Sequence, residues 1–226
     1  MSLTAYIAAW LAYFICANAF ERRFLDRFQD TLPSQYTNTS NQFANLFHGL
    51  AMLILGAWDC LAHYEPLSPL TPFRTEILRF SLAFFIVDTA AILWFRHNRW
   101  DMYFHHALSI FLFANILYTG AFSWYGLAFI ALGELGFSIY LEQLAKRWKV
   151  QKPGFYYAND LCYLILFSSS RVFGLGYLIV TGWPTPSIPL YLKILAVVFY
   201  LLGIYWVWKL GLRFQRRYLA NPSPPT

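Results

Sequence analysis

Long apolar stretches, separated by short polar ones, recur along the whole chain. Each is close to the ~20 residues that a helix needs to cross the hydrocarbon core of a bilayer. Their approximate bounds are residues 3–20, 42–62, 77–95, 101–119, 122–144, 157–181 and 187–209. Prolines, glycines and asparagines fall between them, as is typical of loops. The pattern predicts an all-α integral membrane protein, a bundle of about seven transmembrane helices.

The composition agrees with this pattern and excludes several other classes of protein. The chain has 226 residues, of which 58% are hydrophobic and only 12% charged. Its mean hydropathy of +0.43 is too high for an ordinary soluble domain. The net charge of +6 is accompanied by no nucleic-acid-binding motif. We therefore expect a single membrane domain over residues 1–226, ending in a flexible tail at 218–226.

The basic residues are placed so that they orient the predicted helices. Of the 17 Lys and Arg residues, 13 follow the first, third, fifth and seventh apolar stretches. Cytosolic loops of membrane proteins carry such an excess. The distribution predicts a lumenal N-terminus and a cytosolic C-terminus. The first stretch, 3–20, has no basic leader and reads as an uncleaved anchor.

Six of the ionisable side chains within the apolar stretches fall at a similar predicted depth. Such groups are costly in hydrocarbon and are usually retained for function. Counted from the predicted cytosolic ends at ~1.5 Å per residue, all of them lie between the cytosolic interface and the bilayer centre. Because polar groups inside a membrane need partners, we expect one polar-lined cavity open to the cytosol. A structural ion-pair cluster is the alternative. The six residues are His48, Asp88, His105, His106, Glu134 and Arg171.

The adjacent pair His105 and His106 indicates acid–base or nucleophilic chemistry. On a helix the two rings point about 100° apart, so they serve different roles. One can act as nucleophile or general base, while the other orients it or contacts Asp88 or Glu134. Adjacent histidines chelate one metal ion poorly. A single zinc held by His48, one of the pair and Asp88 stays open as an alternative.

These polar motifs, in this order, resemble those of the TLC-domain superfamily, which includes ceramide synthases and small TLC-domain-containing proteins. The resemblance covers roughly residues 38–214 and leaves 3–20 as an extra first helix. It implies a helical bundle around a lipid-binding tunnel. The matching segments are Leu46-Phe47-His48-Gly49-Leu50, Phe85-Ile86-Val87-Asp88, His105-His106-Ala107-Leu108, Gly133-Glu134-Leu135-Gly136, Leu141-Glu142-Gln143-Leu144, Arg171 and Tyr205-Trp206.

The resemblance also implies an activity. In ceramide synthases the His pair belongs to a site that moves a fatty acyl group from acyl-CoA to the amine of a long-chain base. Carried over, His105 and His106 become the acyl-transfer histidines, with Asp88 and Glu134 as supporting acids. Ceramide synthases carry two aspartates three residues apart on the acidic helix. Here only Glu134 matches, and Phe137 stands where the second acid would be.

The leading hypothesis is therefore a lipid N-acyltransferase of the endoplasmic reticulum membrane, with sphingolipid-type substrates. Acyl-CoA would be its co-substrate, with no tightly bound cofactor and no metal. His48, Arg171, Arg96 and Arg99 are the expected substrate-binding residues. The last two would attract CoA phosphates, unless they serve topology alone. Expected partners are membrane lipids and acyl-CoA, not nucleic acid, and a homo-oligomer is compatible with the sequence.

Two other functions stay open. A non-catalytic protein could use the same cavity for lipid binding, membrane composition or trafficking. A zinc-dependent lipid amide hydrolase would use the alternative metal site. Activity that survives replacement of the His pair would identify the non-catalytic protein. Bound zinc and sensitivity to chelators would identify the hydrolase.

Overall fold

The computed structural model describes residues 1–20, 39–94, 100–133, 138–150 and 152–220, and within these ranges it is helical with no β-strand. Short loops join the helices that meet within one described range. In chain order the elements are α1 (Leu3–Phe20), α2 (Thr39–Ala62), α3 (Pro72–Trp94), α4 (Trp100–Thr119), α5 (Ser123–Gly133), α6 (Ser138–Arg147), α7 (Pro153–Ser168), the π-helical turn η4 (Ser169–Gly174), α8 (Leu175–Gly182), α9 (Leu190–Phe214) and the π-helical turn η5 (Gln215–Leu219).

Many of these helices have the length and apolarity of membrane spans. Among the described residues, five segments are long and apolar enough to cross a bilayer: Leu3–Phe20, Gln42–Ala62, Pro72–Trp94, Pro153–Gly182 and Leu190–Leu219. Helix α5 is apolar but shorter. The prediction of an all-α, membrane-embedded protein with several spanning helices is confirmed to this extent.

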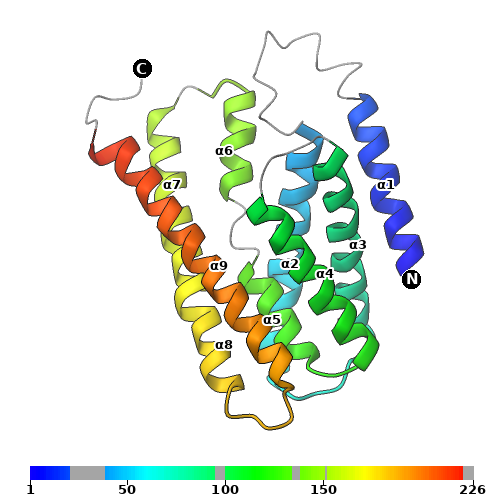
Figure 1. The fold of residues 1–226 in the computed structure, drawn as a ribbon. Helices are drawn as coiled ribbons and strands as arrows, with labels where there is room; N and C mark the ends of the chain where they lie inside the picture. The colour runs from blue at the N-terminus through cyan, green and yellow to red at the C-terminus, as the bar shows by residue number, and fades with distance from the viewer. Residues whose placement is uncertain (21–38, 95–99, 134–137, 151, 221–226) are drawn as a thin grey trace.

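The long helical segments alternate in direction, with α5 and α6 running one way and the continuous segment of α7, η4 and α8 running the other, so the bundle has two distinct ends (Figure 1). Helix α1 begins at the end opposite to that at which α9 and η5 finish. It lies at the edge of the bundle, and only Trp10 and Phe14 of its side chains are buried. The Trp10 ring contacts Phe80 and Phe84 of α3, with centroids 5.1 and 5.0 Å away. Helix α1 is thus a peripheral addition to the other helices.

The apolar core lies mainly between α2, α3, α4 and α5. The largest cluster of buried side chains joins these helices to α1, with Met52, Leu78 and Leu127 almost fully enclosed. Smaller clusters pack α5 against α8 and the beginning of α9.

Two helical segments depart from simple straight spans. The stretch predicted at 122–144 is described as two helices, α5 and α6, on either side of residues 134–137. The stretch predicted at 157–181 is a continuous helical segment from Pro153 to Gly182, with the π-helical turn η4 in its middle. Turns of this kind occur often at functional sites, and η4 contains Arg171.

The C-terminal helix is longer than its apolar pattern predicts. Helix α9 and η5 together continue to Leu219, past the expected end of the span at residue 209. Tyr218 and Leu219, which the composition assigns to a flexible tail, are therefore helical. The remainder of the predicted tail, residues 221–226, lies outside the described residues.

Candidate functional site

A cavity of about 500 Å³ lies inside the bundle. Its walls come from α2, α3, α4, α5, α6, α7, η4 and α9. Aromatic and aliphatic side chains form much of the surface, among them Phe85, Phe113 and Phe199. At one end the wall reaches the exposed side chains of Lys209 and Arg213. The cavity thus extends from the basic end of α9 into the interior of the bundle.

Four of the residues expected at the site line this cavity. Asp88 comes from α3, His105 and His106 from α4, and Arg171 from η4. The side chains of Asp88, His106 and Arg171 are buried. Elements far apart in the sequence therefore bring two imidazoles, one carboxyl group and one guanidinium group to a common space.

The His106 ring is held between two side chains of α3. Its Nδ1 lies 3.0 Å from the Thr89 hydroxyl oxygen, and its Nε2 lies 3.6 Å from Oδ2 of Asp88. The second separation is an ion-pair distance but too long for a hydrogen bond. An imidazole beside a carboxylate can accept a proton from a substrate, because the carboxylate stabilises the imidazolium that forms. Of the groups on the cavity, His106 is therefore the one best placed to accept a proton.

His105 has a different environment, as its rotation on the helix predicts. Its ring meets Phe85, Phe199 and Trp206 edge-on, with centroids 5.7, 5.8 and 5.2 Å away. Within the described part of the chain, the buried Nδ1 of His105 has no hydrogen-bond partner. A buried polar atom of this kind is costly unless something binds it, so this nitrogen is a candidate contact for a polar group of a ligand.

Asp101 is a buried acid that the expected site does not include. It lies one helical turn before His105 and accepts a 2.9 Å hydrogen bond from Nε1 of Trp206. The bond connects the beginning of α4 to α9, and it fixes the indole that contacts the His105 ring. The spacing of four residues between Asp101 and His105 is a sequence signal that could have identified it.

Arg171 closes one wall of the cavity. Its Nη2 donates a 2.9 Å hydrogen bond to the carbonyl oxygen of Gly133, the last residue of α5, where helix carbonyls lack partners. The guanidinium carbon lies 5.0 Å from the ring centroid of Phe167 and 5.7 Å from that of Trp206. Gly203 of α9 makes room for it, because a Cβ there would lie 3.2 Å from the Arg171 side chain. Arg171 thus combines a cap on α5 with a position on the cavity.

His48 does not lie on the cavity, although the sequence places it at a similar depth. Its Nε2 is 2.9 Å from the hydroxyl oxygen of Ser81, and its ring stacks on Phe84 at 3.9 Å. The cavity-facing side chains of α2 are instead Gln42 and Asn45. His48 is a buried packing residue between α2 and α3 in this structure.

The other expected residues are not all described. Glu134, Arg96 and Arg99 lie outside the described residues, so their roles stay predictions. Across the described ranges, no group of three or more His, Cys, Asp or Glu side chains is arranged to hold a metal ion. The zinc ligand set considered from the sequence is also not brought together, because His48 faces Ser81 while Asp88 and His106 face the cavity.

A charged network surrounds the basic end of the cavity. Glu142 of α6 and Asp160 of α7 are buried, and Nη1 of Arg217 bonds both, at 2.9 and 2.8 Å. Arg213 also pairs with Glu142, and Lys146 lies 2.7 Å from it. The network ties α6, α7, α9 and η5 together and holds Arg213 at the rim. The apolar pattern of the sequence does not predict this pairing.

A second buried ion pair lies towards the opposite end of the bundle. Nε of Arg74 donates a 2.7 Å hydrogen bond to Oδ2 of Asp59, and the two side chains are 2% and 5% exposed. Arg74 also donates to Ser68, to Ser123 at 3.3 Å and to the carbonyl oxygen of His63 at 3.2 Å. This group joins α2, α3 and α5 with the α2–α3 loop. Arg74 lies outside the predicted apolar stretch 77–95, so the hydrophobic pattern does not place it inside the bundle.

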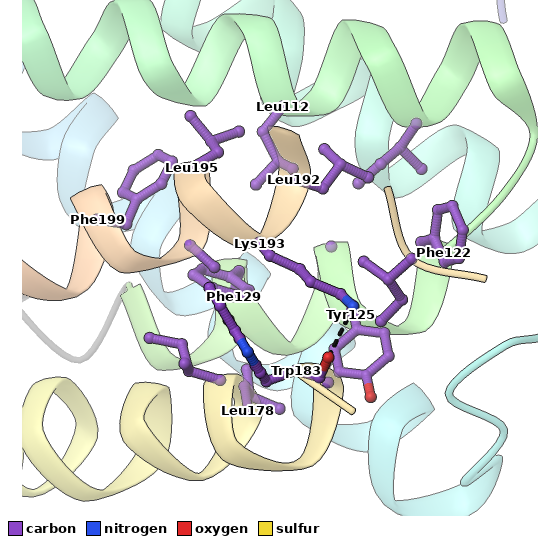
Figure 2. A pocket seen from close by; sticks show the side chains of 16 residues that line it. Leu112, Phe122, Tyr125, Phe129, Leu178, Trp183, Leu192, Lys193, Leu195 and Phe199 are labelled. Carbon is purple, nitrogen blue, oxygen red and sulfur yellow. Dashed lines mark hydrogen bonds between the residues drawn. The ribbon is translucent and has the colours of Figure 1, made fainter. Parts of the chain in front are cut away.

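A small apolar pocket of about 60 Å³ adjoins the main cavity. Leu112, Phe129 and Phe199 line both spaces. Figure 2 shows these side chains between α4, α5 and α9, with Lys193 reaching across to the end of α8. The Lys193 ammonium donates a 2.6 Å hydrogen bond to the carbonyl oxygen of Trp183. These three apolar side chains therefore separate the polar part of the cavity around His106 from a small space suited to hydrocarbon.

Comparison with known proteins adds no relative to this picture. The chain matches no protein-family model, no curated protein and no solved structure. The resemblance to the TLC-domain superfamily therefore rests on the sequence motifs alone.

Proposed function

We propose that this protein is a multi-pass membrane enzyme that transfers an acyl group from acyl-CoA to a lipid amine, as ceramide synthases do. One observation carries the proposal: Asp88, His106 and Arg171, three buried groups from separate elements, line one cavity together with His105. Intramembrane groups of this kind are usually functional. The surrounding aromatic and aliphatic side chains suit an acyl chain.

In the proposed topology the chain crosses the membrane seven times. Support comes from the alternating directions of the helices (Figure 1) and from the basic residues at one end of the bundle, such as Lys146 and Lys209. The N-terminus is then lumenal and the C-terminus cytosolic. Acyl-CoA reaches the cavity from the cytosol, and Lys209 and Arg213 at the rim attract its phosphates. The proposed membrane is that of the endoplasmic reticulum.

The proposed chemistry is an aminolysis of a thioester. The amine nitrogen of the lipid attacks the thioester carbonyl carbon while Nε2 of His106 accepts the amine proton. The new C–N bond forms, the C–S bond breaks, and the proton on the imidazolium passes to the departing CoA thiolate. Asp88 stabilises the imidazolium between these two transfers. General-base catalysis of this kind contributes about 10²- to 10⁴-fold to a rate.

The apolar pocket gives a prediction about chain length. Phe129 stands between the main cavity and the small pocket, so Phe129→Ala should let the end of a longer chain pass. We expect the ratio of product formed from a longer over a shorter acyl-CoA to rise at least about tenfold, since single methylenes in apolar pockets discriminate to this degree. Competition between the two acyl-CoAs, read by mass spectrometry, measures the ratio.

Phe111→Ala is the matched control for this substitution. Phe111 is also a large aromatic side chain, but it is exposed on the outer face of α4. It should leave the product ratio unchanged. Equal ratios for the wild type and Phe129→Ala would contradict a path for the acyl chain through this wall.

The activity itself is tested with purified protein in lipid nanodiscs. Radiolabelled acyl-CoA and a panel of long-chain amines are supplied, and we expect an N-acylated lipid together with free CoA. Absence of product with every acyl-CoA and amine, from protein that is folded and carries bound lipid, would contradict the proposed transfer.

A non-catalytic lipid-binding protein is the second candidate. The apolar pocket favours it. Among the described residues that line this pocket, the ionisable side chains are those of Tyr125 and Lys193, and the ammonium group of Lys193 donates to a backbone carbonyl. Such a space binds hydrocarbon without chemistry. This candidate requires that replacing His105 and His106 together leaves the protein's effect on cellular lipid composition unchanged, whereas the transferase requires that the effect is lost.

A further inference from the structure

Thr89 of α3 contacts the proposed base but does not line the cavity. Its hydroxyl oxygen lies 2.5 Å from the carbonyl oxygen of Phe85, one turn earlier on the same helix. The same oxygen lies 3.0 Å from Nδ1 of His106. Thr89 therefore stands between a fixed backbone acceptor and an imidazole nitrogen that can be either donor or acceptor.

The number of available hydrogens decides the direction of these two bonds. A threonine hydroxyl has one hydrogen to donate and two positions at which it can accept. A carbonyl oxygen can only accept, so the hydroxyl hydrogen lies on the bond to Phe85. The contact with His106 is then a bond in which Nδ1–H donates to the Thr89 oxygen. This assignment follows from the two distances and from the chemistry of the groups.

The opposite nitrogen of the ring faces the reaction space. With the proton on Nδ1, Nε2 of a neutral His106 carries the lone pair. It faces Asp88, whose Oδ2 is 3.6 Å away, and both residues line the cavity. Because 3.6 Å is too long for a hydrogen bond, Asp88 does not hold a proton on Nε2. The nitrogen directed towards the cavity is thus the one able to accept a proton from a substrate amine.

We infer that Thr89 is a positioning residue that fixes His106 in the Nδ1–H tautomer and so keeps Nε2 available as the base. The catalytic consequence of this tautomer rests on the proposed acyl transfer. The tautomer itself follows from the contacts of Thr89 and does not depend on that function. Without the Thr89 oxygen, the nearby Asp88 carboxyl is the remaining acceptor. The proton then favours Nε2, where it blocks the base.

Nuclear magnetic resonance of the intact protein in nanodiscs tests the tautomer directly. The histidine rings are labelled with nitrogen-15, and the His106 signals are identified as those missing from a His106→Gln sample. At a pH where His106 is neutral, the wild type and Thr89→Ser should show the proton on Nδ1. Thr89→Val, which keeps the shape but removes the acceptor, should show it on Nε2.

Rates of acyl transfer provide the second measurement. Thr89→Val should lose about 10²- to 10⁴-fold in turnover, the contribution of general-base catalysis, while Thr89→Ser stays within a few-fold of the wild type. Thr75→Val is the matched control, since the Thr75 hydroxyl of α3 also donates to a carbonyl oxygen four residues earlier, that of Thr71, at 2.8 Å. It should change neither the His106 tautomer nor the rate.

The outcomes separate the two proposals. A wild-type spectrum with the proton on Nε2 overturns the role of Thr89 whatever the rates are. The expected tautomers in a protein without acyl transfer support the positioning role and contradict the proposed function. An unchanged tautomer in folded Thr89→Val overturns the inference. If that variant does not fold, the wild-type and Thr89→Ser spectra still decide it.

Discussion

His106→Gln should lower the turnover of acyl transfer by about 10²- to 10⁴-fold, the range of general-base catalysis. Glutamine has a similar size and can still donate to the Thr89 oxygen, but it has no nitrogen that accepts a proton beside Asp88. Because the residue acts on the reacting atoms and not on the CoA phosphates, KM for acyl-CoA should change little. Initial rates with radiolabelled acyl-CoA measure both quantities.

His63→Gln is the control for this substitution. This variant replaces the same type of side chain at the opposite end of the bundle, where the His63 side chain is 53% exposed. It should transfer acyl groups at the wild-type rate. Equal rates for His106→Gln and the wild type, in protein of equal stability, would remove His106 from the mechanism.

Arg74→Met should produce the largest loss of stability, about 3–5 kcal/mol in the free energy of unfolding. The substitution leaves the Asp59 carboxylate buried without the guanidinium that lies 2.7 Å from it. It also removes the hydrogen bonds that Arg74 makes to Ser123 and to the carbonyl of His63. Unfolding in mild detergent, followed by circular dichroism, measures the change.

Two further variants separate burial from charge. Arg79→Met removes an arginine from the same helix, but its pair with Glu76 is exposed on both sides, at 38% each. Pairs of this kind contribute little, so the unfolding midpoint should hardly move. Asp59→Asn combined with Arg74→Met should recover part of the loss, because no charge is then left buried. Equal destabilisation by Arg74→Met and Arg79→Met would contradict the role of the buried pair.

Much of the fold follows from the length of the apolar stretches. The stretch predicted at 3–20 has the bounds of α1, and that predicted at 101–119 differs from α4 by one residue. Length is a useful guide because a spanning helix must match a fixed thickness of hydrocarbon, and α1 is one of the five described segments that are long and apolar enough to do so. The π-helical turn η4 has no such signal. It inserts a residue within one continuous helical segment, Pro153–Gly182, and neither the length nor the mean hydropathy of that segment marks the change of period.

The depth of the site residues follows from the sequence, but their direction does not. Counting along the helices places Asp88, His106 and Arg171 in one layer, and these residues do line one cavity. The same count includes His48, which faces Ser81. A helix that is hydrophobic all round does not reveal which face turns inward, and rotation about its axis decides which side chains meet.

Partners from distant segments are hardest to predict. Thr89 directly follows Asp88 and precedes His106 by 17 residues, and its spacing indicates nothing about a shared bond. Lys209 and Arg213 at the cavity rim likewise read as residues that set topology. Their place at the rim emerges only because α9 passes beside α4 and η4, which brings these basic residues to the cavity that the histidines line.

The central claim is that an acyl chain occupies the cavity beside His106. Photolabelling tests it most directly, with an acyl-CoA that carries a diazirine in its chain and mass spectrometry to locate the attached residues. We predict labels on cavity-lining residues such as Phe85, Ser109 and Phe113, reduced by competition with unmodified acyl-CoA. Labels confined to residues exposed on the outer surface, such as Phe47 and Phe111, and unaffected by the competitor would contradict it.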